Sequence, residues 1–249
     1  MKNKRGLAVF LSVTACILII VTAIGVATIR QYSITDKLCD AIAENKTAEA
    51  LELIEETKDV NMYTFSPFLL RPLTAVGINI RNPLVEACRA GDPVIVQALL
   101  EKGADPNTYL QGYWSPIEAT FLKPKADRLE IARMLIAYGA EVDLSGSGDS
   151  ALFRELQNMI YSQNRESFDP EAILLLLENG AAPIDGKGNT IMHYVCYAGD
   201  MELLEKLSEK YGEYLFLENQ QGQAPLIWAM ESGAEDVVDY LKGDGSKTD

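Results

Sequence analysis

The chain opens with an apolar segment that differs from everything after it. From Gly6 to Ile29 it has 24 consecutive residues without a charge, bounded by Arg5 and Arg30. As a helix that rises about 1.5 Å per residue, this run would cover roughly 36 Å, more than the roughly 30 Å hydrocarbon core of a bilayer. The pattern predicts a transmembrane helix over 6–29, with a basic tail at 1–5 and a linker at 30–35.

The charges around this segment predict its orientation. Lys2, Lys4 and Arg5 precede the run, whereas Arg30 and Lys37 follow it among acidic residues. Basic residues concentrate on the cytoplasmic side of a span. We therefore expect a cytoplasmic N-terminus and an extracytoplasmic remainder in a single-pass membrane protein.

A cleaved secretory signal is the alternative interpretation of the same run. Gly25, Val26 and Ala27 supply the small residues that precede a signal-peptidase cut, so cleavage near Ala27 would release a secreted chain. The apolar core of a signal peptide is usually only about 7–15 residues long. The greater length here favours an uncleaved anchor.

After residue 36 the apolar positions recur with a long period. A short apolar phrase returns several times, and its third residue falls at positions 84, 117, 152, 192 and 226, with spacings of 33, 35, 40 and 34 residues. Such a period indicates stacked repeats with insertions. The copies are NPLVEA at 82–87, SPIEA at 115–119, SAL at 150–152, TIMH at 190–193 and APLIWA at 224–229.

A second phrase recurs with about the same period, each time directly after an apolar helical run. It reads GAD at 103–105, GAE at 139–141 and GAA at 180–182. A glycine here can end a helix in the left-handed conformation. Polar turns at 185–190 and 219–224 then lead into the next helix, so the unit is turn, helix, turn, helix.

These phrases resemble the ankyrin repeat, in which a T-P-L-H-x-A phrase starts the first helix and a G-A-D turn follows the second. The resemblance covers residues 36–243 and implies an all-α solenoid of about six helix pairs with hairpin-like fingers and a concave binding surface. The first unit is degenerate and begins near Asp36. Insertions at 62–79, 123–127 and 162–170 interrupt the period, and 244–249 is expected to be a flexible tail.

Composition and charge narrow the classes of partner. Residues 31–249 carry 18 basic and 36 acidic residues, which disfavours nucleic acid and suits a basic protein. Cys39, Cys88 and Cys196 fall in or beside the first-helix phrase, where we expect buried, unreactive thiols. No cysteine–histidine spacing suggests a metal site, and no cofactor is implied.

His193 is the single histidine of the chain. It occupies the His position of the T-P-L-H phrase, and the resemblance implies a structural hydrogen-bonding role. Most acid–base catalysis would have to use this residue. We therefore expect a protein that is not an enzyme.

The finger at 107–114 is the strongest candidate for partner contact because aromatic residues occupy a turn that is usually polar. Tyr109, Tyr113 and Trp114 could supply rigid binding area, although packing against the adjacent finger is the alternative. The register of the repeat adds further exposed candidates. They are Arg89, Lys123, Tyr197 and Glu231 at the ends of first helices, with Lys187 and Gln221 at finger tips.

The leading hypothesis is a membrane-tethered scaffold or regulator that binds a protein partner, with an inhibitor or immunity protein as one specific form. One alternative is an enzyme or accessory subunit, which would show a deep pocket with convergent carboxylates. Another is a structural subunit of a membrane complex that associates through the small residues of the span.

Overall fold

The computed structural model describes residues 2–66, 79–110, 113–122, 127–144, 150–161 and 169–244, with side chains described from residue 21 onward except at 65, 66, 79 and 244. Helices dominate, and one two-stranded ribbon accompanies them in these ranges. The first half contains α1 (Lys2–Ala43), α2 (Thr47–Glu56), β1 (Thr64–Ser66), β2 (Asn79–Arg81), α3 (Pro83–Ala90), α4 (Pro93–Glu101), α5 (Pro116–Thr120) and α6 (Arg128–Ala137). The second half contains α7 (Ala151–Tyr161), α8 (Pro170–Glu178), α9 (Ile191–Ala198), α10 (Met201–Tyr211), the 3-10 helix η2 (Gly212–Leu215), α11 (Pro225–Ser232) and α12 (Glu235–Asp244).

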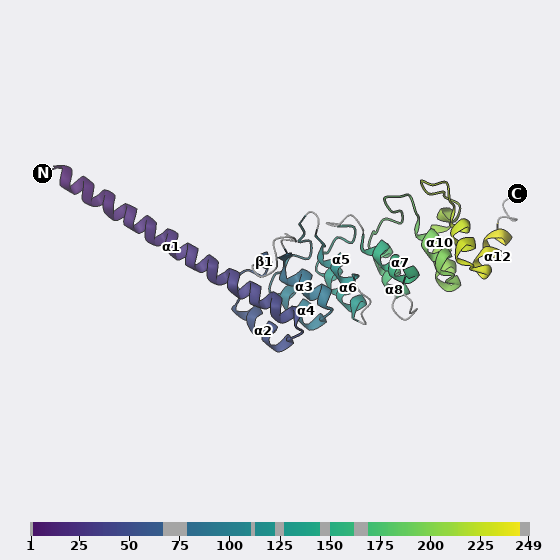
Figure 1. Ribbon diagram of the computed structural model, residues 1–249, viewed down its shortest axis with the longest axis horizontal. Coiled ribbons are helices and arrows are strands. Elements are labelled where there is room, and N and C mark those ends of the chain that lie inside the picture. Colours follow the sequence, from purple (N-terminus) through teal and green to yellow (C-terminus); the bar gives the residue numbers. More distant parts are fainter. Residues whose placement is uncertain are drawn as a thin grey trace, which may run out of the picture.

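The helices pair in chain order and stack into an elongated array (Figure 1). First helices contact first helices along the stack, as in α3 with α5 and α9 with α11, and second helices do the same, as in α4 with α6. In Figure 1 the connections between successive pairs gather along one edge, and α1 projects from the N-terminal end. This is the helical repeat architecture that the 33-residue period predicts.

The apolar phrase provides the core of each repeat. Its third residues Leu84, Ile117, Leu152 and Met192 are each at most 1% exposed, so one register position is buried in repeat after repeat. A single unit cannot bury its own apolar face. Neighbouring units cover these side chains when the repeats stack.

Local signals set where the helices begin and end. Asn82 caps α3 by accepting hydrogen bonds from the backbone N–H groups of Leu84 and Val85. At the other end of the units, the glycines of the G-A-x phrase have φ of 91°, 90° and 94°, a region that side chains disfavour. The predicted left-handed helix ends at 103, 139 and 180 are confirmed.

The expected linker at 30–35 is instead part of α1. This helix continues without a break to Ala43, because 30–35 contains neither proline nor glycine and Thr35 is buried while Gln31 bonds to the segment after α2. Gln31 Nε2 donates to Thr57 Oγ1 at 2.7 Å, and Gln31 Oε1 accepts from the backbone N–H of Lys58.

Most of the predicted membrane span, residues 6–20, lies outside the described side chains. Within the described part of the chain, no helix combines the length and the apolarity needed to cross a membrane. Residues 21–29 are described, and Val21, Ile24, Val26 and Ile29 are 59–71% exposed.

The insertion at 62–79 begins and ends in the ribbon. β1 and β2 pair antiparallel, with Thr64 opposite Arg81. Arg81 in turn donates to Asp36 Oδ1 and Asp40 Oδ1 on α1, at 2.5 and 2.6 Å. The ribbon thereby fastens α1 to the second repeat. Residues 67–78 of this insertion, 123–126 of the second and 162–168 of the third lie outside the described residues.

Candidate protein-binding site

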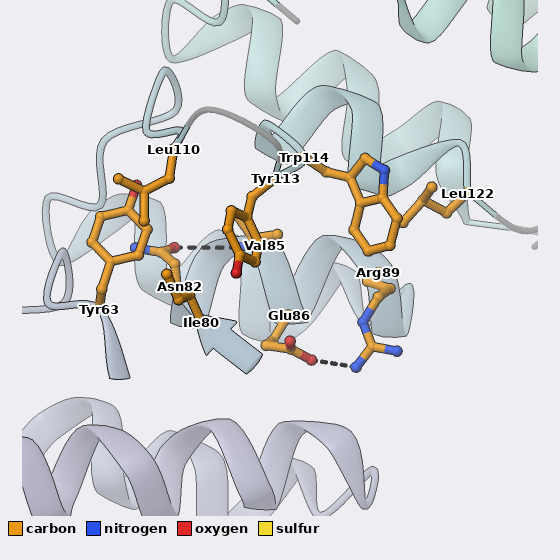
Figure 2. Close-up of a pocket in the computed structure, with 10 residues that line it drawn as sticks. All are labelled: Tyr63, Ile80, Asn82, Val85, Glu86, Arg89, Leu110, Tyr113, Trp114 and Leu122. Atoms are coloured by element: carbon orange, nitrogen blue, oxygen red, sulfur yellow. Dashed lines mark hydrogen bonds and ion pairs between the residues drawn. The ribbon is translucent and has the colours of Figure 1, made fainter. Parts of the chain in front are cut away.

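A pocket of about 510 Å³ lies where the ribbon, α3 and the segment before α5 meet (Figure 2). Three parts of the sequence build it, because stacking brings neighbouring repeats together. Its lining is mainly apolar and aromatic. The lining residues are Tyr63, Ile80, Asn82, Val85, Glu86, Arg89, Leu110, Tyr113, Trp114 and Leu122.

Capping interactions hold the aromatic wall of the pocket. α5 starts at a capping box in which Glu118 N–H donates to Ser115 Oγ and Ser115 N–H donates to Glu118 Oε2. This box fixes the chain direction immediately after Trp114. The backbone N–H of Tyr113 also donates to the carbonyl of Leu110, at 2.8 Å, which links two of the lining residues.

On the opposite side, Tyr63 joins the ribbon to the finger. Its hydroxyl lies 2.6 Å from Thr108 Oγ1. Figure 2 shows the rings of Tyr63, Tyr113 and Trp114 arranged along the pocket. Trp114 remains 38% exposed, so its ring is available to a partner.

One ion pair at the edge of the pocket involves the predicted site residue Arg89. Its Nη2 donates to Glu86 Oε2, one helical turn earlier on α3. Glu86 is buried whereas the Arg89 side chain is 37% exposed. The pair neutralises the charge at this edge and leaves part of the guanidinium plane accessible.

The predicted site residues therefore differ in whether they line the pocket. Tyr113, Trp114 and Arg89 line one pocket, whereas Tyr109 is 47% exposed and does not line it. Residue type alone does not reveal which of them line the pocket. Lys123 lies outside the described residues.

Two further candidates come together at the C-terminal end of the stack. Lys187 and Gln221 line a smaller pocket of about 260 Å³ together with Tyr161, Tyr194 and Trp228. The ring of Tyr197 lies 6.1 Å from that of Trp228, edge to face. Glu231 is exposed on α11 and does not line either pocket.

Sequence reasoning missed several lining residues. Tyr63, Val85 and Leu110 are apolar or aromatic residues at positions that resemble ordinary core or loop positions, so no local signal distinguishes them. Tyr161 could have been identified, because it ends the first helix α7 as Tyr197 lies near the end of α9, whereas Trp228 lies in the middle of α11.

The histidine side chain is part of the structural hydrogen-bond network. His193 is fully buried, with Nδ1 accepting from the backbone N–H of Thr190 at 3.0 Å and Nε2 lying 2.9 Å from the carbonyl of Gln223. Nδ1 therefore lacks a proton and Nε2 donates, which is the neutral tautomer. Burial lowers the pKa of His193 from its ordinary 6.5.

The three thiols of the repeats behave as expected for core residues. Cys39, Cys88 and Cys196 are buried, and burial raises the pKa of each thiol to about 12. A thiol with such a pKa is a poor nucleophile at neutral pH. Among the described residues, no three acidic, histidine or cysteine side chains gather in a way that could hold a metal ion.

Comparison with known proteins agrees with the repeat architecture. The ankyrin repeat family model matches residues 79–109, and a model of three consecutive ankyrin repeats matches 159–249. The ankyrin repeat protein L86 of Acanthamoeba polyphaga mimivirus is 27% identical over 113 residues, which cover 41% of this chain and 20% of L86. The alignment thus spans about a fifth of that relative's length.

A solved structure has a similar fold over most of the chain. It is one chain of the complex between the predatory endopeptidase Bd0816 of Bdellovibrio bacteriovorus and the immunity protein Bd3460. The TM-score is 0.61 at 24% identity, with 85% of this chain and 97% of that chain covered. At this identity the likeness concerns the fold.

Proposed function

This chain carries ankyrin repeats, and from that premise we propose that it is a non-catalytic scaffold that binds a protein partner across the pocket beside Trp114. The observation that carries the proposal is the composition of the pocket. Partly exposed aromatic rings surround an apolar floor, and a charged pair lies at the edge. Binding hot spots have this character: aromatic and arginine residues in well-packed pockets with a polar rim.

A regulator of an enzyme is the specific form that we favour. The fold resembles one chain of a complex between an endopeptidase and an immunity protein, and a rigid stack can cover another protein's surface without a conformational change. The acidic excess of the repeats suits a partner with a basic surface.

The N-terminal part of α1 supports membrane tethering as a second element of the proposal. The exposed apolar residues of this part lie on different faces of the helix. They are Val21, Ile24, Val26 and Ile29. A helix that is apolar all round requires a nonpolar environment. We propose that residues 6–29 anchor the repeats to a membrane with the repeats outside the cytoplasm.

Affinity capture tests the scaffold function. The tagged full-length protein is extracted from its native cells in mild detergent, and bound proteins are identified by mass spectrometry for the wild type and for Tyr113→Ala/Trp114→Ala. We expect a specific protein that is lost from the double variant. Tyr109→Ala is the matched control, because Tyr109 belongs to the same finger but not to the pocket.

Other outcomes would separate the alternatives. A specific partner retained by the double variant would move the binding site away from this pocket. Absence of any specific partner, together with turnover in activity screens, would favour the enzyme hypothesis.

A further inference from the structure

Asn82 has a polar atom that its structural role leaves unused. Its Oδ1 accepts from the backbone N–H groups of Leu84 and Val85 at 3.0 and 3.3 Å, which identifies this atom as the oxygen and caps α3. Its Nδ2 is buried and has no hydrogen-bond acceptor among the residues that the structure describes. A buried donor without an acceptor destabilises the folded chain, because it has given up its hydrogen bonds to water.

The residue that carries this donor lines the pocket, and the donor atom itself is covered by its neighbours. Asn82 is 3% exposed and is one of the lining residues. Figure 2 shows its amide nitrogen turned away from the capped helix, toward the side on which Tyr63 and Leu110 lie. An oxygen from outside the chain would therefore satisfy this donor once the side chains that cover it shift aside.

The surroundings of Asn82 select an uncharged ligand group. Ile80, Val85 and Leu110 provide apolar surface. The edge charges on Glu86 and Arg89 are already paired with each other, so neither is left to neutralise an incoming charge. The volume of about 510 Å³ lies within the roughly 300–1,000 Å³ range of pockets that hold small ligand groups.

We propose that this pocket binds an extended segment of the protein partner by one aromatic or large aliphatic side chain, while a backbone carbonyl of that segment accepts a hydrogen bond from Asn82 Nδ2. The proposal rests on the proposed scaffold function and specifies the chemistry that the site recognises. Apolar contact supplies the affinity, and the carbonyl satisfies the donor that the fold leaves buried.

The chain itself suggests a substitution that isolates the donor. Ser115 precedes Pro116 in the next repeat as Asn82 precedes Pro83, and Ser115 caps its helix. Asn82→Ser should therefore retain the cap and the fold while removing the amide donor. Asn82→Asp keeps the cap as well, but it replaces the donor with a charged acceptor.

The test uses the full-length chain and four capped peptides, acetyl-Gly-Gly-X-Gly-Gly-amide with X as Phe, Leu, Lys or Glu. Binding is followed by intrinsic tryptophan emission, and Trp114→Phe assigns the response to the pocket. We expect the Phe and Leu peptides to bind more tightly than the Lys and Glu peptides. Asn82→Ser should weaken the Phe peptide about fivefold and Asn82→Asp more strongly, in proportion to one lost hydrogen bond and added repulsion.

Asp169→Ser is the matched control, because it changes a helix cap of α8 that is remote from the pocket, and it should leave peptide affinity unchanged. Tighter binding of the Lys or Glu peptide, or equal binding of the Phe peptide to Asn82→Ser, would overturn the proposal. So would self-association of the wild type that Val85→Lys abolishes, since the occupant would then be a second copy. If affinity capture yields a partner that depends on Trp114 while no peptide binds, this inference fails and the scaffold function stands.

Discussion

His193 illustrates how the repeat uses a titratable residue for structure. Both ring nitrogens have backbone partners, and the ring of Trp228 packs edge to face on it, 5.3 Å away between centroids. Burial lowers its pKa, so the folded chain binds a proton at His193 less readily than the unfolded chain does. The free energy of unfolding should accordingly fall as the pH decreases through 6.5.

This pH dependence can be separated from that of the carboxylates. Chemical denaturation between pH 5.5 and 8 compares the wild type with His193→Gln, which cannot titrate. We expect the stability advantage of the wild type over the variant to shrink as the pH falls below 6.5. An advantage that stays constant would contradict the assigned neutral state of His193.

A buried ion pair joins the third and fourth repeats. Arg128 Nη2 lies 2.8 Å from Glu155 Oε1, with the two side chains 4% and 0% exposed. Glu155→Gln would leave the Arg128 charge buried without its counterion, and we expect it to lower the free energy of unfolding by about 3–5 kcal/mol.

The double variant Arg128→Met/Glu155→Gln removes both charges. Its free energy of unfolding and that of Glu155→Gln are measured by denaturant titration. Its glutamine retains an acceptor for the backbone N–H of Asp169, which Glu155 Oε1 binds at 2.8 Å in the wild type. The double variant should recover most of the loss. A double variant as unstable as Glu155→Gln would show that the charge is not the cause.

At the scale of elements, one position of the repeat bridges neighbouring units. Asn61 donates to the carbonyl of Gly103 and accepts from the N–H of Asp105. Asn107 makes the same two bonds to residues 139 and 141, at 2.9 and 2.8 Å. In the next unit Asp143 only accepts, from the N–H of Ala182, because a carboxylate has no donor.

This comparison predicts a stabilising substitution. Asp143→Asn would supply the missing donor to the carbonyl of Gly180, and we expect it to raise the free energy of unfolding by about 1 kcal/mol. The mirror change, Asn107→Asp, removes one bond and should lower it by a similar amount. Thermal unfolding of both variants checks the pair, and changes of the same sign in both would refute the bridge.

At the scale of the whole molecule, α1 has two parts with different roles. The large apolar residues of 21–29 are exposed, whereas Leu38, Cys39 and Ile42 are fully buried against the first repeat. A chain that begins at Arg30 should therefore keep the stability of the repeats. A chain that begins at Glu44 should lose more than about 4 kcal/mol, because several core side chains are removed together.

Denaturant titration of both shortened chains tests this division, and vesicle flotation of the full-length chain and the Arg30 chain tests the tether. We expect only the full-length chain to float with the vesicles. Equal flotation of both chains would argue against an anchor at 6–29, and unfolding of the Arg30 chain would mean that the exposed part of α1 supports the fold.

The sequence alone determined the features that depend on local order. The period and the glycine helix ends follow from propensity and register, which act within one unit. The apolar character of the third residue of each phrase and of the cysteine positions can likewise be read from the sequence. The structural hydrogen-bonding role of His193 was implied by the resemblance of residues 190–193 to the repeat phrase, and the structure shows both of its partners.

Only the tertiary structure decided which side chains share a surface. Tyr63, Val85 and Trp114 meet because stacking places the ribbon, α3 and the finger side by side, whereas Tyr109 belongs to the same finger and does not line the pocket. The unused donor of Asn82 depends equally on its neighbours, since capping α3 occupies its oxygen while none of the described residues around it offers an acceptor to its nitrogen. Contacts between repeats arise from side chains far apart in the sequence, and a periodic pattern does not specify them.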